Sequence, residues 1–184
     1  MAFLLNRLEQ KLSAVGAESK KALVAYLVAG DPDLETTLEL MHGFVASGVD
    51  IIELGVPFTD PIAEGPIIQA AHDRALQTDT SLDKIFGLVE KFRIKDSDTP
   101  IILMGYINTF LANSLALESI HERGTDAVLI VDIPGESTLE KIGINNTNIA
   151  SISLISPTTD RQRIEKICQT SSGFIYYVTL RGVT

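Results

Sequence analysis

The sequence predicts an α/β fold in which parallel strands alternate with helices. The strands are indicated by six short apolar runs, rich in β-branched residues, that each lead into a turn. Apolar residues follow one another in these runs, as is typical of parallel strands covered on both faces. Because helical patterns separate the runs and no three strands follow in direct succession, an α/β fold is favoured. The six runs span residues 22–30, 49–56, 100–107, 126–133, 148–156 and 173–180.

Helical spacing of apolar residues fills the connections between these strands. Residues 33–48 form the first such helix, with Asp33 as its expected N-cap and Gly48 as its stop. Residues 81–93 and 115–124 repeat the pattern. An additional helix, 66–77, occupies the long gap between the second and third strands. The connection 135–148 is a poor helix candidate, because a glycine and three asparagines lie near its end.

Two architectures fit this alternation, a doubly wound sheet and a (β/α)8 TIM barrel. A dinucleotide-binding doubly wound sheet would place G-x-G-x-x-G after the first strand, but residues 29–35 read AGDPDLE. The barrel is therefore preferred. A closed barrel has eight strands, so we expect about six of its eight β/α units here. Residues 1–184 are predicted to be a single barrel domain that lacks its C-terminal units.

Composition narrows the class of protein. The chain is 45% hydrophobic and 21% charged, which is ordinary for a globular protein. No apolar run has the length of a membrane span or of a signal peptide core, so we expect a soluble, cytoplasmic protein without a membrane partner. A formal net charge of -9 disfavours nucleic acid as a partner.

The cysteine and histidines are predicted to be structural. Because Cys168 is the chain's single cysteine, no internal disulfide can form. Its helical setting predicts that it is buried and has a packing role. The three histidines, His42, His72 and His121, fall in helical stretches without metal-ligand spacing. We therefore expect them to be surface or packing residues, and we expect no metal site.

Glu53 is the residue that the strand pattern does not explain. It interrupts the apolar run IIELGV, where a buried carboxylate costs several kcal/mol unless it is paired or protonated. Active sites of barrels lie at the carboxyl ends of the strands. A carboxyl in apolar surroundings has a raised pKa and can act as both acid and base near neutral pH. Glu53 is therefore the first candidate catalytic residue, although an ion pair with an arginine would also explain it.

The loop after this strand carries two further acids. Asp60 and Glu64 lie between Pro57 and Pro66, and prolines restrict the loop's freedom. A restrained acidic loop beside a buried acid suggests a pair of carboxylates at one site. From spacing alone, Asp60 could equally be a turn-forming residue and Glu64 a solvated charge.

Residues 52–69, IELGVPFTDPIAEGPIIQ, resemble the signature of the tryptophan synthase α subunit family. Further ordered matches extend the resemblance over the whole chain: LVAGDP at 27–32, LMGYIN at 103–108, VDIP at 131–134, SPTTD at 156–160 and YYVTLRGVT at 176–184. This family is a (β/α)8-barrel lyase of tryptophan biosynthesis. It cleaves indole-3-glycerol phosphate to indole and glyceraldehyde 3-phosphate by a retro-aldol reaction. Within an αββα heterotetramer it passes the indole through a tunnel to a β subunit that uses pyridoxal phosphate.

The resemblance assigns roles to particular residues. Glu53 matches the family's acid/base. Glu64 falls where the family more commonly has an aspartate that receives the indole N–H, so its carboxylate sits one methylene further out. The resemblance implies no cofactor in this chain, since pyridoxal phosphate belongs to the β subunit. Residues implied to face the β subunit are Phe58, Asp60, Pro61 and Asn108. Residues implied to bind the substrate are Tyr26, Met104, Tyr106, Val131, Leu154, Tyr176, Val178 and, on a closing loop, Thr184.

Two other functions are compatible with the sequence. One is another phosphate-handling barrel lyase or isomerase, such as indole-glycerol-phosphate synthase or phosphoribosylanthranilate isomerase. Those sites usually rely on a lysine or a cysteine, and no lysine lies within the strand runs here. The other is a non-catalytic activator that binds and stimulates the β subunit.

Overall fold

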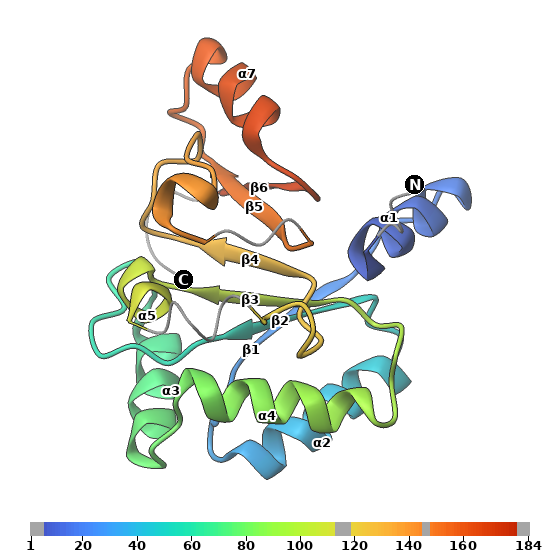
Figure 1. Ribbon diagram of the computed structural model, residues 1–184, viewed down its shortest axis with the longest axis vertical. Helices are drawn as coiled ribbons and strands as arrows, with labels where there is room; N and C mark the ends of the chain where they lie inside the picture. The colour runs from blue at the N-terminus through green and yellow to red at the C-terminus, as the bar shows by residue number, and fades with distance from the viewer. Residues whose placement is uncertain (1–5, 113–118, 145–147, 180–184) are drawn as a thin grey trace.

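The computed structural model describes residues 6–112, 119–144 and 148–179, and its centre is a six-stranded parallel sheet (Figure 1). Each strand pairs with the next one along the chain, in the order β1-β2-β3-β4-β5-β6. All six predicted strands are confirmed, each somewhat shorter than its apolar run. Their bounds are Val24–Val28 (β1), Ile51–Gly55 (β2), Ile101–Gly105 (β3), Ala127–Ile130 (β4), Ala150–Ile155 (β5) and Ile175–Tyr177 (β6).

The helices occupy the connections, largely as predicted. The elements are α1 (Arg7–Ala17), α2 (Leu34–Ala46), α3 (Pro66–Gln77), α4 (Leu82–Arg93), α5 (Ile107–Leu111), the 3-10 turn η1 (Glu140–Ile142) and α7 (Arg161–Thr170). Asp33 caps α2 through the Thr36 amide, and Gly48 follows its end with φ of 94°, as predicted. The connection 135–148 contains only η1 among its described residues, in agreement with its poor helical pattern.

Three features differ from the sequence prediction. Helix α1 was not expected, although Asn6 and Glu9 form a reciprocal capping box at its start. Short helix α5 was also missed. The predicted helix 115–124 lies partly outside the described residues, and its described part, 119–124, forms turns instead of a helix. Gly124, with φ of 98°, supplies the left-handed geometry that leads the chain from these turns toward β4.

Successive side chains of each strand point to opposite sides of the sheet and build two separate apolar layers. On β2, Ile52 and Leu54 join the layer formed with α2 and α4, and we call this side the helix-covered face. Ile51 points the other way and packs with Leu8 of α1. We call this second side the inner face. It also contains Ile102, Ala127, Leu129, Ala150 and Ile152.

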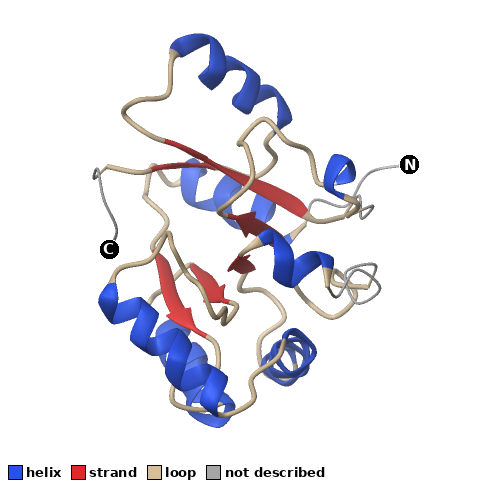
Figure 2. Ribbon diagram, turned by 90° about the vertical axis from the view of Figure 1, so that its left-hand side faces the viewer, coloured by secondary structure: helices blue, strands red, loops and turns tan. Residues whose placement is uncertain are grey.

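Helix α7 lies at the opposite end of the molecule from α2 and α4 (Figures 1 and 2) and buries fewer of its residues than α4 does. Ile167 is its buried residue. Cys168 is exposed, so the prediction that it is buried was wrong. The reason is that this polar helix contacts the rest of the chain along a narrow stripe, and Cys168 lies about 100° around the helix from Ile167. Among the described residues, no helix is long and apolar enough to cross a bilayer.

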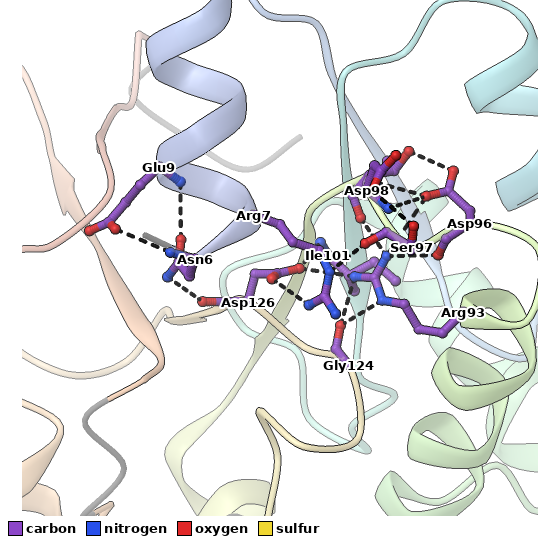
Figure 3. A network of polar contacts seen from close by, with 11 residues as sticks. Asn6, Arg7, Glu9, Arg93, Asp96, Ser97, Asp98, Ile101, Gly124 and Asp126 are labelled. Atoms are coloured by element: carbon purple, nitrogen blue, oxygen red, sulfur yellow. Dashed lines mark hydrogen bonds and ion pairs between the residues drawn. The ribbon is translucent and has the colours of Figure 1, made fainter. Parts of the chain in front are cut away.

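A buried carboxylate joins four elements at the amino ends of the strands (Figure 3). Asp126, fully buried, lies 2.9 Å from Arg7 Nη1 of α1 and 2.9 Å from Arg93 Nη2 of α4. It also accepts a hydrogen bond from the Ile101 amide of β3. Arg93 in turn donates to the carbonyls of Gly124 and Thr99. The buried negative charge is thus fully paired, and it fixes α1 and α4 to the base of β3 and β4.

Substituting Asp126→Ala should lower the free energy of unfolding by about 3–5 kcal/mol, because removal of one partner leaves buried charge and an unpaired amide. Urea denaturation measures this change. Asp83→Ala serves as a matched control, since Asp83 is 78% exposed where it pairs with Arg123. The control should lose less than about 1 kcal/mol. Equal, small losses in the two variants would show that the Asp126 network does not hold the base of the sheet.

Candidate functional site

Glu53 lies on the inner face, at the middle of β2. It belongs to β2, where its register partners are Tyr26 of β1 and Ile102 of β3. The residue is only 3% exposed, and no salt bridge joins it to a described basic side chain. Burial, followed by the negative charge of Glu64, raises the pKa of Glu53 to about 7. The alternative explanation by an arginine partner is therefore not supported in the described part of the chain.

Glu64 is brought to the same site by the loop between β2 and α3. It is 5% exposed, and burial raises the pKa of its carboxyl. The loop folds back in a turn in which the Glu64 amide donates to the Pro61 carbonyl at 3.0 Å. Gln69 of α3 donates its side-chain amide to the Glu64 carbonyl at 2.7 Å. Glu64 is close enough to Glu53 for its charge to raise the pKa of that residue, and because Glu64 is buried it is not a solvated surface charge.

Three tyrosines share this environment. Burial raises the pKa of Tyr26, with Glu64 and Glu53 as the next contributions. Burial also raises the pKa of Tyr176, helped by Glu53, and that of Tyr106, helped by Glu64. The Tyr26 hydroxyl lies over Gly55, where a side-chain Cβ would overlap it. Glycine at this position therefore leaves room for a phenol beside the carboxylates.

The apolar residues predicted to line the site fall mainly on the inner face. Met104, Val131 and Leu154 are half-buried and pack against the inner layer. Leu154 pairs in register with Tyr176, so both point to the same side. Val178 follows β6 and donates its amide to the Ile155 carbonyl. Thr184 lies outside the described residues. The inner face thus offers aromatic and aliphatic surface together with two carboxylates.

Tyr106 has a second role that the sequence did not reveal. Its hydroxyl accepts a hydrogen bond of 3.0 Å from the Ala63 amide. Its ring stacks on Phe58, with 4.8 Å between ring centroids and an interplanar angle of 19°. Both contacts reach into the loop after β2. Tyr106 therefore supports the loop that carries Glu64, in addition to bordering the site.

The residues predicted to face a partner differ in accessibility. Asp60 and Asn108 are exposed, Asp60 on the loop after β2 and Asn108 in the short helix α5 that follows the adjacent strand β3. Phe58 is half-buried against Tyr106. Pro61 is buried and accepts the Glu64 amide, so within this chain it shapes the turn.

The histidines were predicted to be surface or packing residues, and His42 and His72 are packed, but His72 also contacts the loop between β2 and α3. His42 stacks on Phe92. His72 is buried in α3, and its Nδ1 accepts a hydrogen bond of 3.1 Å from the Phe58 amide. The helical spacing of Gln69 and His72 places both on one face of α3, but it does not tell which part of the chain that face meets. Among the described residues, no group of three or more His, Cys, Asp or Glu side chains is arranged to hold a metal ion.

This arrangement is suited to proton transfer at neutral pH. A carboxyl with a pKa near 7 is present in both protonation states, so it can donate a proton and then accept one. The second carboxylate supplies negative charge at a fixed place, and the surrounding apolar surface suits a flat, uncharged ring.

Known proteins share this sequence and fold. The model of the family described as "Tryptophan synthase alpha chain" matches residues 12–184. The tryptophan synthase alpha chain of Alkalilimnicola ehrlichii is 45% identical over 183 residues, which cover 98% of this chain and 67% of that protein. The crystal structure of tryptophan synthase subunit alpha from Legionella pneumophila superposes with a TM-score of 0.87 at 40% identity, covering 97% of this chain and 70% of that one.

The subunit from the hyperthermophile Pyrococcus furiosus, solved within a tryptophan synthase α2β2 complex, gives a TM-score of 0.79 at 37% identity and covers 88% of this chain and 66% of that one. These comparisons confirm the predicted barrel architecture, of which this chain contains six consecutive parallel strands. By its sequence and its structure, the chain belongs to the tryptophan synthase alpha chain family.

Proposed function

We propose that this protein, an enzyme of tryptophan synthesis, is a carbon–carbon lyase that cleaves indole-3-glycerol phosphate into indole and glyceraldehyde 3-phosphate. The observation that carries the proposal is the carboxyl of Glu53, which is buried on the inner face without a basic partner among the described residues and has its pKa raised to about 7. A retro-aldol cleavage of this substrate requires delivery of a proton to the ring and removal of a proton from the side-chain hydroxyl. A carboxyl titrating near neutral pH can do both.

In the proposed reaction, Glu53 first delivers its proton to the ring carbon that bears the glycerol chain. Deprotonation of the adjacent hydroxyl then lets the carbon–carbon bond break. The electrons of that bond return to the ring and the hydroxyl carbon becomes the aldehyde, so no redox partner is required. Glu64 accepts the hydrogen bond from the ring N–H and stabilises the positive charge that forms when the ring is protonated.

The position of Glu64 supports the separate roles proposed for the two carboxylates. Its backbone is held by Pro61 and Gln69, and its side chain is buried beside Glu53. The loop therefore accommodates the longer carboxylate without exposing it. The tyrosines and the apolar residues of the inner face, Tyr26, Met104, Tyr106, Val131, Leu154, Tyr176 and Val178, are proposed to contact the ring, and Thr184 is proposed to act on a closing loop.

We further propose that the β subunit of tryptophan synthase binds over this end of the sheet. The α2β2 assembly of the Pyrococcus furiosus relative supports this partner. Asp60 and Asn108 are exposed there and are proposed to contact it directly, while Phe58 and Pro61 shape the contacting loop. The reaction proposed for this chain needs only proton transfers, so we place pyridoxal phosphate in the β subunit.

Substituting Glu53→Gln should reduce indole formation at least about 100-fold, because an amide cannot exchange protons at neutral pH. Indole release from indole-3-glycerol phosphate, with and without β subunit, measures the loss. Retention of more than a tenth of the activity would refute Glu53 as the acid/base.

The same variant also gives a test that does not depend on activity, namely the pH dependence of its free energy of unfolding. A carboxyl whose pKa is raised from 4.5 to about 7 on folding binds its proton more tightly in the folded state. The parent's free energy of unfolding should therefore fall as pH rises from about 4.5 to 7. The Gln variant should lack that part of the fall, so its relative stability should increase with pH. An identical pH dependence in the two proteins would contradict a raised pKa at Glu53.

Substituting Glu64→Asp should preserve or increase turnover if the shorter carboxylate, more common in this family, can still reach the ring N–H. Steady-state indole formation measures the effect, and urea denaturation confirms that the fold is unchanged. A loss of about 100-fold with an intact fold would show instead that the loop is built for the longer side chain.

Substituting Asp60→Ala should leave the reaction of the isolated chain largely unchanged and weaken its stimulation by the β subunit, because Asp60 is exposed and lies outside the carboxylate pair. Asn108→Ala, at the neighbouring exposed position, tests the same surface. Equal damage to the isolated and stimulated reactions would move Asp60 into the catalytic site.

A further inference from the structure

His72 forms a hydrogen bond with the loop between β2 and α3, the loop that carries Glu64, and helix packing alone does not require this contact. It lies on α3 between Ala71 and Ala75, which pack as small apolar residues, and it is 2% exposed. Its Nδ1 accepts the hydrogen bond from the Phe58 amide across 14 residues of sequence. An alanine like its neighbours would have satisfied the packing but would have left this loop amide without its acceptor.

The hydrogen bond fixes the protonation state of the ring. Since the Phe58 amide is the donor, Nδ1 must be unprotonated, and the proton of the neutral imidazole is then on Nε2. Nε2 is buried and has no acceptor among the described residues. Burial lowers the pKa of His72, although Asp73 partly opposes this effect. The neutral form, which alone can accept the Phe58 amide, is therefore the favoured one.

His72 completes a set of three side chains that hold the loop at successive points. Gln69 holds the Glu64 carbonyl, and Tyr106 holds the Ala63 amide. Tyr106 also stacks on the ring of Phe58, the residue whose backbone His72 binds. The loop is thus fixed near its start by His72 and near its end by Gln69. Between these points lie the residues proposed to contact the β subunit and to stabilise the substrate.

We infer that His72 is a positioning residue for the proposed lyase reaction, whose neutral imidazole fixes the Phe58 backbone and thereby the loop that presents Glu64 to Glu53. The inference rests on the proposed function for its effect on turnover. Its structural part, a hydrogen bond that orders the loop, stands separately and can be measured without substrate.

Two substitutions separate the hydrogen bond from simple occupancy of the space. His72→Asn places an amide oxygen near the position of Nδ1, so it should keep the acceptor. His72→Gln extends its amide toward the position of Nε2 and should not. In the full protein, NMR-detected hydrogen exchange of the Phe58 amide should stay slow in the Asn variant and become at least about 10-fold faster in the Gln variant. Turnover should follow the same order, with kcat about 10-fold lower in the Gln variant and KM less affected.

Three results would overturn the inference. Equal turnover and equal Phe58 exchange in the Asn and Gln variants would mean that the acceptor position is irrelevant. Unchanged exchange with reduced turnover in both would show that the ring acts only through packing. Full activity in a His72→Leu variant would remove the need for any acceptor. If His72→Leu does not fold, the Asn and Gln pair still decides the question.

A parallel Glu53→Gln protein distinguishes failure of this inference from failure of the proposed function. That variant should lose indole formation while its Phe58 amide stays protected, because Glu53 is on β2 and does not bind the loop amide. An active Glu53→Gln protein with a His72-dependent Phe58 amide would refute the lyase chemistry and leave the loop contact intact.

Discussion

The site depends on the register of the parallel strands. Parallel neighbours in register point their side chains to the same face, so the pairing of Tyr26 with Glu53 and of Leu154 with Tyr176 places all four on the inner face. A slip of one residue in β2 would turn Glu53 into the layer formed with α2 and α4, where a carboxylate has no partner. The chemistry of the site is therefore fixed by the same backbone hydrogen bonds that build the sheet.

Two buried carboxylates of this sheet, Asp126 and Glu53, are treated in opposite ways. Asp126, at the amino ends, is matched by Arg7, Arg93 and a backbone amide, so its charge is fully compensated. Glu53 has no basic partner among the described residues, and its burial, followed by the charge of Glu64, disfavours its ionised form. The carboxylate of Asp126 holds elements together, whereas that of Glu53 is the one proposed to transfer protons.

Features that depend on residues close together in the sequence could be predicted, whereas features that depend on contacts between distant elements could not. The six strands could be predicted because a buried strand is a run of apolar residues in the sequence itself. Glu53 could be recognised as unusual because it interrupts such a run. The approach of Glu64 could be suggested from its loop but not decided, since its burial depends on contacts with Gln69 and Tyr106 from other elements. The exposure of Cys168 and the hydrogen bond of His72 were not predicted, because each depends on which side of a helix meets the rest of the chain.

The loop after β2 and the protonation of Glu53 are linked through Glu64. Part of the rise in the pKa of Glu53 comes from the charge of Glu64, and Glu64 is near only while the loop is held in place. Displacing the loop would remove that contribution and let Glu53 ionise more readily. By thermodynamic linkage, protonation of Glu53 must then favour the placed loop by the same free energy. The side chains that hold the loop, among them Tyr106 and Gln69, therefore act on the proton affinity of a residue that they need not touch.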